Sequence, residues 1–180
     1  MIIRVDDVSP NTDMYELNLT AEFLYKELNA EIWYCVTLFS RSSFLGSVYP
    51  DLPMRGRELE YFTTINNVMA NYKFPSFVKV ASHGLLHVEH GKLDEQAQMM
   101  SIFTSCSFLN TNIFVPPFMS FNQTTLNICE DKGIIIIHPE KWRSMETEKF
   151  DASHSHWYFH PWRMELSQVK EWINASKIIA

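Results

Sequence analysis

Short apolar runs alternate with amphipathic stretches along the whole chain. Six runs are apolar and rich in β-branched or aromatic residues, which is typical of buried strands. Five other stretches carry apolar residues at helical spacing, and the first of them follows a capping residue. The predicted strands are 2–5, 32–39, 77–81, 112–115, 134–137 and 157–159, and the predicted helices are 12–30, 57–72, 93–109, 123–133 and 165–179.

The alternation of strands and helices predicts parallel strands that are covered by helices. Both a barrel and an open, doubly wound sheet fit this pattern. No glycine-rich phosphate loop follows the first strand, so a nucleotide-binding fold has no positive support. We therefore expect an α/β fold, a distorted (β/α) barrel with six or seven parallel strands, formed by one domain over residues 1–180.

Composition narrows the range of partners and locations. The chain has 46% hydrophobic and 20% charged residues, and its net charge of −6 without a basic run argues against nucleic acid as a partner. No apolar run is long enough to span a bilayer, and the N-terminus lacks the pattern of a secretory signal. The three cysteines are widely spaced in apolar contexts, which is typical of reduced, buried thiols. These features predict a cytoplasmic protein and leave its oligomeric state open.

Acids and histidines recur where the predicted strands end. Asp6 and Asp7 follow the first strand, His83 follows the third, and His160 follows the last. In parallel α/β folds these strand ends share one face, where chemistry gathers. His87 lies four residues after His83, and the pair with one acid would make the open N/N/O ligand set of a catalytic zinc site. The alternatives are a polar loop for the histidines and a turn or helix cap for the aspartates.

Adjacent carboxylates repel each other, and a nearby cation relieves that cost. Asp6 and Asp7 therefore permit a division of labour, in which one binds the metal and the other acts as general base. His160 could then protonate the leaving group. We expect a divalent ion, with zinc as the first choice and cobalt, nickel or manganese as alternatives.

Four short motifs resemble those of the polysaccharide deacetylases of carbohydrate esterase family 4 (CE4), which are metal-dependent enzymes that remove acetyl groups from amino sugars. In chain order they are "IRVDD" at 3–7, "HGLLH" at 83–87, "VPPF" at 115–118 and "FHPW" at 159–162. The order and approximate spacing match over almost the whole chain. The resemblance implies a distorted barrel with fewer than eight strands and a substrate that carries an N-acyl group.

The resemblance also implies a role for each matching residue. These are Asp6 as base, His160 as acid, Asp7, His83 and His87 as metal ligands, and Pro117 and Phe118 at the oxyanion and substrate position. At that last position the stabilising group would be the backbone N–H of Phe118.

The sequence departs from the family pattern in three places. Val115 replaces the arginine that holds the catalytic aspartate, and Arg163 is a candidate substitute, with a plain surface arginine as the alternative. Gly84 replaces the hydroxyl residue between the two motif histidines, which removes a supporting hydrogen bond. The aspartate that tunes the acid histidine has no clear counterpart. Candidates for that role are Asp151, Glu140 and Glu165.

Two further segments border the expected site. The stretch 40–56 is the longest without a regular pattern, and we expect it to overhang the site, where Arg41, Tyr49 and Arg55 could bind a sugar or an anionic group. His154 and His156 are expected in a loop beside the site rather than in a second metal centre.

The expected function is a metal-dependent hydrolase of carbon–nitrogen bonds other than peptide bonds, removing an N-acyl group from an amino sugar. A small-molecule or lipid-linked sugar precursor in polysaccharide synthesis is the expected substrate, by analogy with the family. One alternative is a catalytically inactive carbohydrate-binding module with the same fold, which Val115 favours. Another is a hydrolase of a different linear amide.

Overall fold

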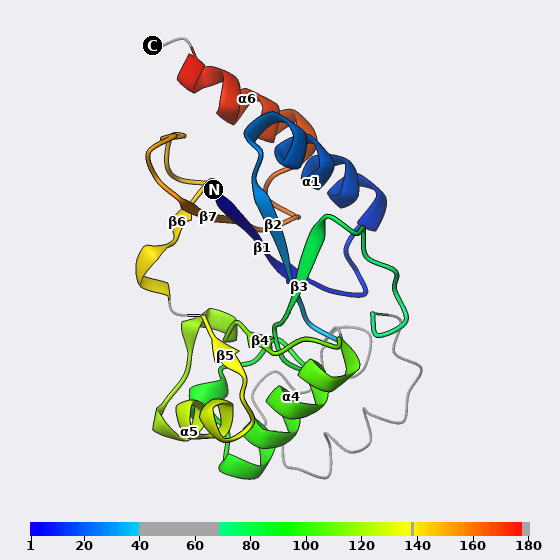
Figure 1. Ribbon diagram of the computed structural model, residues 1–180, viewed down its shortest axis with the longest axis vertical. Helices are drawn as coiled ribbons and strands as arrows, with labels where there is room; N and C mark the ends of the chain where they lie inside the picture. The colour runs from blue at the N-terminus through cyan, green and yellow to red at the C-terminus, as the bar shows by residue number, and fades with distance from the viewer. Residues whose placement is uncertain (40–68, 138, 178–180) are drawn as a thin grey trace, which may run out of the picture.

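Parallel strands build a single curled sheet around which the chain is organised. The computed structural model describes residues 1–39, 69–137 and 139–177. Within them seven strands pair in the order β5-β4-β3-β2-β1-β7-β6, so that β5 and β6 are the two edges (Figure 1). The strands are β1 (Ile2–Val8), β2 (Glu31–Val36), β3 (Val78–Ser82), β4 (Ile113–Phe114), β5 (Ile135–Ile136), β6 (Arg143–Ser144) and β7 (His156–Phe159). The predicted fold class is confirmed, in the form of a seven-stranded half-barrel.

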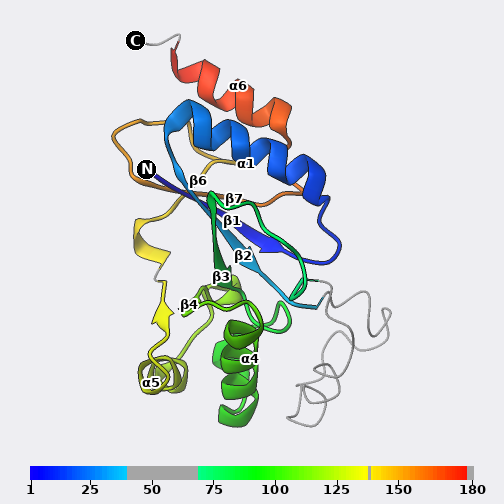
Figure 2. The same cartoon turned by 45° about the vertical axis from the view of Figure 1, so that its right-hand side comes forward.

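Helices pack against this sheet in two groups, which Figures 1 and 2 separate clearly. The first group is α1 (Met14–Leu28) with α6 (Leu166–Lys177), and the second is α4 (Glu95–Phe108) with α5 (Gln123–Asp131). Three short 3-10 helices complete the described elements. They are η2 (His90–Lys92), η3 (Pro117–Met119) and η4 (Pro139–Lys141). None of the helices in the described ranges has both the length and the apolar character needed to cross a membrane.

Side-chain caps fix where the helices begin. Asp13 accepts hydrogen bonds from two amides of the first turn of α1, and Asp94 accepts one at 2.7 Å from the amide of Ala97 in α4. Asn122 and Thr125 form a reciprocal capping box at the start of α5. Each cap satisfies amides that have no partner inside the helix, so these short polar residues set the helix register.

The strand β1, which pairs with β2 and β7, is buried on both of its faces. Ile3 and Val5 belong to the main hydrophobic core, which the helices α1 and α6 complete. Because neighbouring residues in a strand point to opposite faces, Arg4 and Asp6 lie on the inner face of the half-barrel. Both of these charged residues are also buried. The interior of the half-barrel therefore contains buried charged groups, Arg4 and Asp6, close to the end of β1.

The structure differs from the sequence-based elements in several places. The predicted strand 32–39 ends at Val36, and residues 69–71 of the predicted second helix form turns. The first strand was predicted to end at Val5, but β1 continues to Val8 and therefore contains Asp6 and Asp7. The two-residue strand β6 was not predicted. Residues 57–68 of the predicted second helix lie outside the described residues, as does the segment 40–56 with Arg41, Tyr49 and Arg55.

Candidate metal centre and active site

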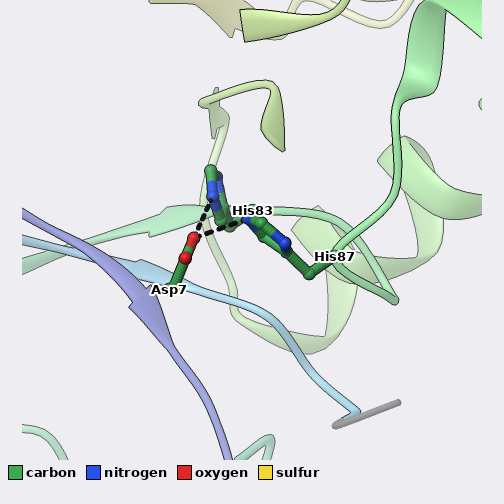
Figure 3. Close-up of side chains that lie close together, drawn as sticks. All are labelled: Asp7, His83 and His87. Carbon is green, nitrogen blue, oxygen red and sulfur yellow. Dashed lines mark hydrogen bonds and ion pairs between the residues drawn. The ribbon is translucent and has the colours of Figure 1, made fainter. Parts of the chain in front are cut away.

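Three side chains converge at the end of β1: Asp7 from β1 itself, and His83 and His87 from the segment that follows β3. The Asp7 Oδ1 atom lies 2.8 Å from Nε2 of His83 and 2.7 Å from Nε2 of His87. Figure 3 shows the carboxylate reaching both imidazole rings. One ligand atom from each residue lies within 4.8 Å of the other two. The structure therefore brings together the three residues that the sequence singled out as ligands, in a geometry that could hold a metal ion.

The backbone of Asp7 adopts an unusual conformation that makes this convergence possible. Regular alternation would send the adjacent side chains of Asp6 and Asp7 to opposite faces. The pairing of β1 with β2 slips between Val5 and Val8, and Asp7 has a φ of 59°. A non-glycine residue in this left-handed region costs about 1–3 kcal/mol, and such strain gathers at functional sites. The bulge turns Asp7 toward the histidines.

Hydrogen bonding prepares His83 to bind a metal. Its Nδ1 lies 2.6 Å from the carbonyl oxygen of Val115, which can only accept a hydrogen bond. Nδ1 therefore carries a proton, and Nε2 is the atom directed toward Asp7. A carbonyl behind the distal nitrogen is the usual support for a metal-binding histidine. Although Val115 lacks the charge of an arginine, its backbone orients this ligand.

Electrostatics keeps the carboxylate ligand ionised. Burial on its own raises the pKa of Asp7, but hydrogen bonds from His83 and His87 outweigh it and hold the pKa well below its ordinary value. A metal ligand must be deprotonated, and the donor set of two imidazoles and one carboxylate suits zinc and related divalent ions. The three residues therefore fit the ion that the sequence predicted.

The absence of a hydroxyl residue at position 84 has a steric explanation. Gly84 has a φ of +86°, and a Cβ built there would lie 2.7 Å from Cε1 of His90. The His90 ring is fully buried, with Nε2 2.8 Å from the hydroxyl of Ser101. Burial lowers the pKa of His90 to about 3, so the ring is neutral. His90 fills the space that a side chain at position 84 would need.

His160 lies at the edge of the metal group and is held by a glutamate. Its Nε2 is 4.0 Å from Oδ2 of Asp7, and its Nδ1 is 2.6 Å from Oε1 of Glu146. The same Glu146 oxygen accepts the backbone amide of His160 at 2.7 Å, while Oε2 lies 3.3 Å from Nη1 of Arg163. Glu146 therefore occupies the tuning position for which the sequence offered three other acids.

The residues expected to support the site lie elsewhere. Asp151 is exposed, bonds to Ser153 and faces Arg143 at 3.7 Å, so it does not orient His160. Glu140 is also exposed, and the amide of Glu165 bonds to Gln168 at the start of α6. Arg163 pairs with Glu146 and not with Asp6, so its expected role as the partner of the base is wrong.

Asp6 is paired instead with a residue of its own strand. Arg4 Nη2 donates a hydrogen bond of 2.8 Å to Oδ2 of Asp6, and Arg4 Nε lies 2.7 Å from Oδ1 without hydrogen-bond geometry. Both side chains are buried. The sequence did not indicate Arg4 as a site residue. A single charged residue in an apolar run does not reveal that both faces of β1 are buried.

Two exposed aromatic side chains flank the metal group. The Phe118 ring centroid lies 4.3 Å from that of His87, and the Trp162 centroid lies 4.9 Å from that of His160. Phe118 follows the buried Pro117 and has a φ of 53°, and its amide has no hydrogen-bond acceptor among the described residues. His154 precedes β7, and His156 is its first residue, paired with Ile2 at the start of β1. The two histidines therefore lie at the opposite end of the strands from the metal group, so their expected place in a loop beside the site is wrong.

The fold is shared with solved structures of the CE4 family. A CE4 family pseudoenzyme from Bacillus anthracis matches with a TM-score of 0.59 and 15% identity, over 100% of this chain and 61% of its own. A peptidoglycan N-acetylglucosamine deacetylase matches with a TM-score of 0.58 and 12% identity, over 98% of this chain and 81% of its own. The CE4 domain of a multidomain xylanase from the hindgut metagenome of Trinervitermes trinervoides gives 0.54 and 10%, with 98% and 82% covered.

These comparisons confirm the resemblance to CE4 deacetylases at the level of the fold, and the low identities mark the chain as divergent. The chain spans 61% of the length of the pseudoenzyme. No protein-family model matches the sequence, and no curated protein matches it.

Proposed function

We propose that the chain is a metal-dependent amidohydrolase that removes an acetyl-like N-acyl group from an amino sugar. The main support for this proposal is the set of groups around Asp7. Two imidazole nitrogens contact its carboxylate, Asp6 is the adjacent residue, and His160 Nε2 lies 4.0 Å from Asp7 Oδ2. This combination offers a metal site, a base and an acid within one centre. The CE4-like fold, which includes a deacetylase among its matches, supports the same reaction.

Each residue has a defined task in this proposal. A divalent ion on Asp7, His83 and His87 would polarise the acyl carbonyl and lower the pKa of the attacking water. The Asp6 carboxylate takes the proton of that water. His160 Nε2 then delivers a proton to the leaving nitrogen. The carboxylate of Glu146, 2.6 Å from His160 Nδ1, fixes the ring and balances its positive charge.

The surroundings suit a sugar with a flat, partly apolar face. We assign the stabilisation of the developing oxyanion to the amide N–H of Phe118, which has no hydrogen-bond acceptor among the described residues. The exposed rings of Phe118 and Trp162 offer apolar surfaces on two sides of the metal group. Zinc is the proposed ion, because histidine and carboxylate ligands suit it. The cytoplasmic location and the small-molecule or lipid-linked substrate stay predictions.

The second candidate is a carbohydrate-binding protein that has lost catalysis. Two observations favour it: Val115 stands at the arginine position, and one structure with the same fold is a CE4 family pseudoenzyme. The arrangement of Asp6, His160 and Glu146 favours the enzyme, because a binding protein has no need for an oriented acid and base.

Metal titration and hydrolysis together separate the candidates. Calorimetric titration of metal-stripped protein with zinc should show one tight site, which His83→Ala removes. His154→Ala is the matched control, because the His154 ring contacts the Lys141 carbonyl and the Trp157 ring and lies outside the metal group. The zinc-loaded protein is then assayed for amine release from N-acetylated amino sugars and their oligomers. Turnover supports the hydrolase, zinc binding without turnover supports the binding protein, and absence of zinc binding overturns the metal site.

A further inference from the structure

The guanidinium of Arg4 is enclosed in the interior of the half-barrel. Its side chain is fully buried, and its carbon Cζ lies 4.5 Å from the ring centroid of Trp142 and 5.4 Å from that of Tyr158. A buried arginine is rare unless it is paired, because removing its charge from water is costly. The aromatic faces of Trp142 and Tyr158 offset part of this cost and restrict the orientation of the guanidinium.

The Arg4 guanidinium forms its ion pair with Asp6. Contacts of 2.8 Å and 2.7 Å join two Arg4 nitrogens to the two carboxylate oxygens of Asp6. No other cationic side chain in the described part of the chain forms an ion pair with Asp6. Cys35 does not compete with Asp6 for the guanidinium: burial, and after it the charge of Asp6, raises the pKa of this thiol well above its usual range, so Cys35 stays uncharged. The position of the Asp6 carboxylate therefore depends on Arg4.

Position 115 has no charged group that could replace this interaction. The Val115 side chain is buried in a small apolar cluster with Cys35 and Ala81. Cys35 lies in β2, Ala81 in β3, and Val115 directly after β4. These three strands are neighbours in the sheet, and β2 pairs with β1, which carries Asp6. Among the described residues, the interior thus contains the guanidinium of Arg4, two residues before Asp6 on β1, and apolar side chains at the end of β4.

A purely structural ion pair is the competing explanation, and the energetics disfavours it. A buried ion pair commonly contributes no more stability than a well-packed apolar pair of the same volume. The strand β1 would therefore lose nothing by carrying apolar residues at both positions. The pair is explained if the Asp6 carboxylate, next to the candidate ligand Asp7, must be held in one orientation.

We infer that Arg4 is the positioning residue of the base Asp6, and that it supplies from the same strand the guanidinium that the resemblance to CE4 enzymes led us to expect at position 115. This inference rests on the proposed function, because Asp6 needs orienting only if it accepts a proton. Arg4 itself touches no reacting atom. Its contribution is the alignment of the Asp6 carboxylate with the water, so it acts on turnover and not on substrate affinity.

Relocation of the guanidinium is the decisive experiment. Arg4→Met should lower kcat by about 100-fold, the scale of a misplaced catalytic group, with KM and zinc content unchanged. The double variant Arg4→Met/Val115→Arg should recover about tenfold or more of that loss, because the new side chain enters the same interior. Arg4→Lys, which keeps the charge without the two-nitrogen fork, should lie between wild type and Arg4→Met and covers the case in which Arg4→Met does not fold.

A double-mutant cycle distinguishes the failure of this inference from the failure of the proposed function. In an Asp6→Asn background, the Arg4 substitutions should lower kcat by less than about twofold, because residues that act as a unit are not additive. Equal losses in both backgrounds, or loss of zinc and a raised KM in Arg4→Lys, would make the pair structural and overturn the inference. Full activity in Asp6→Asn alone would instead overturn the proposed function.

Discussion

Replacing Glu146 by glutamine tests the acid side of the site most sharply. Glutamine keeps the shape of the side chain and an acceptor oxygen, but it removes the negative charge that faces His160 Nδ1 at 2.6 Å. The Glu146 side chain is only 9% exposed, so solvent does little to screen that charge. A hydrogen bond to a charged group contributes about 1.5–3 kcal/mol. Without this stabilisation of the charged imidazolium, which is the form of His160 that donates the proton, kcat should fall by about 10- to 150-fold.

The assay is amine release from an N-acetylated amino sugar by zinc-loaded Glu146→Gln, with zinc content and thermal unfolding measured in parallel. KM and zinc content should stay at wild-type values, because Glu146 contacts neither the metal group nor the flanking aromatic rings. Glu148→Gln is the matched control: its carboxylate is 45% exposed and lies 3.6 Å from Arg143, and it should keep full activity. Unchanged kcat in Glu146→Gln, with the fold intact, would contradict the role of the Glu146 charge in supporting His160 as the proton donor.

Three further predictions follow from the surroundings of the site. Gly84→Ala should destabilise the fold by about 1–3 kcal/mol in chemical unfolding, because of its φ of +86° and the contact with His90, whereas Gly133→Ala, with positive φ but open space, should cost less. Burial lowers the pKa of His90 to about 3, so the folded protein keeps this ring neutral, whereas the unfolded chain takes up a proton near pH 6.5. Between pH 7 and pH 5 the free energy of unfolding of wild type should therefore fall by about 2 kcal/mol more than that of His90→Gln. Equal pH dependence of unfolding in the two proteins would contradict this. Phe118→Ala and Trp162→Ala should raise KM by about tenfold while changing kcat little, because the rings contact the substrate outside the reacting centre; a loss confined to kcat would contradict their role as sugar platforms.

Much of the fold could be predicted because parallel strands and their helices carry strong periodic patterns. The four longer strands lie in apolar runs, and the helices α1, α4 and α5 lie where apolar residues recur at helical spacing. The strand β6 has only two residues, Arg143 and Ser144, and so offers no period to detect. Glu146, which follows it, had no structural context in the sequence and was missed for that reason.

The candidate ligands could be predicted because their positions follow from topology. Strands that run in parallel end at one face, which brings Asp7 near His83 and His87. The bulge at Asp7 could not be predicted, because a positive φ at an aspartate within an apolar strand leaves no mark in composition. Arg4 was missed for a related reason: a single charged residue among apolar neighbours reads as the solvent-facing position of a strand, and only the curl of the sheet encloses it.

The central claim is that Asp6 acts as a base beside a metal held by Asp7, His83 and His87. The most direct measurement is the rate of amine release per bound zinc ion for wild type, Asp6→Asn and the control Asp151→Asn, whose carboxylate is exposed. The account predicts stoichiometric zinc in all three proteins, wild-type turnover in Asp151→Asn, and a loss of about 100-fold or more in Asp6→Asn, the usual scale for removing a general base. Turnover in Asp6→Asn equal to that of wild type, at equal zinc content, would contradict the account.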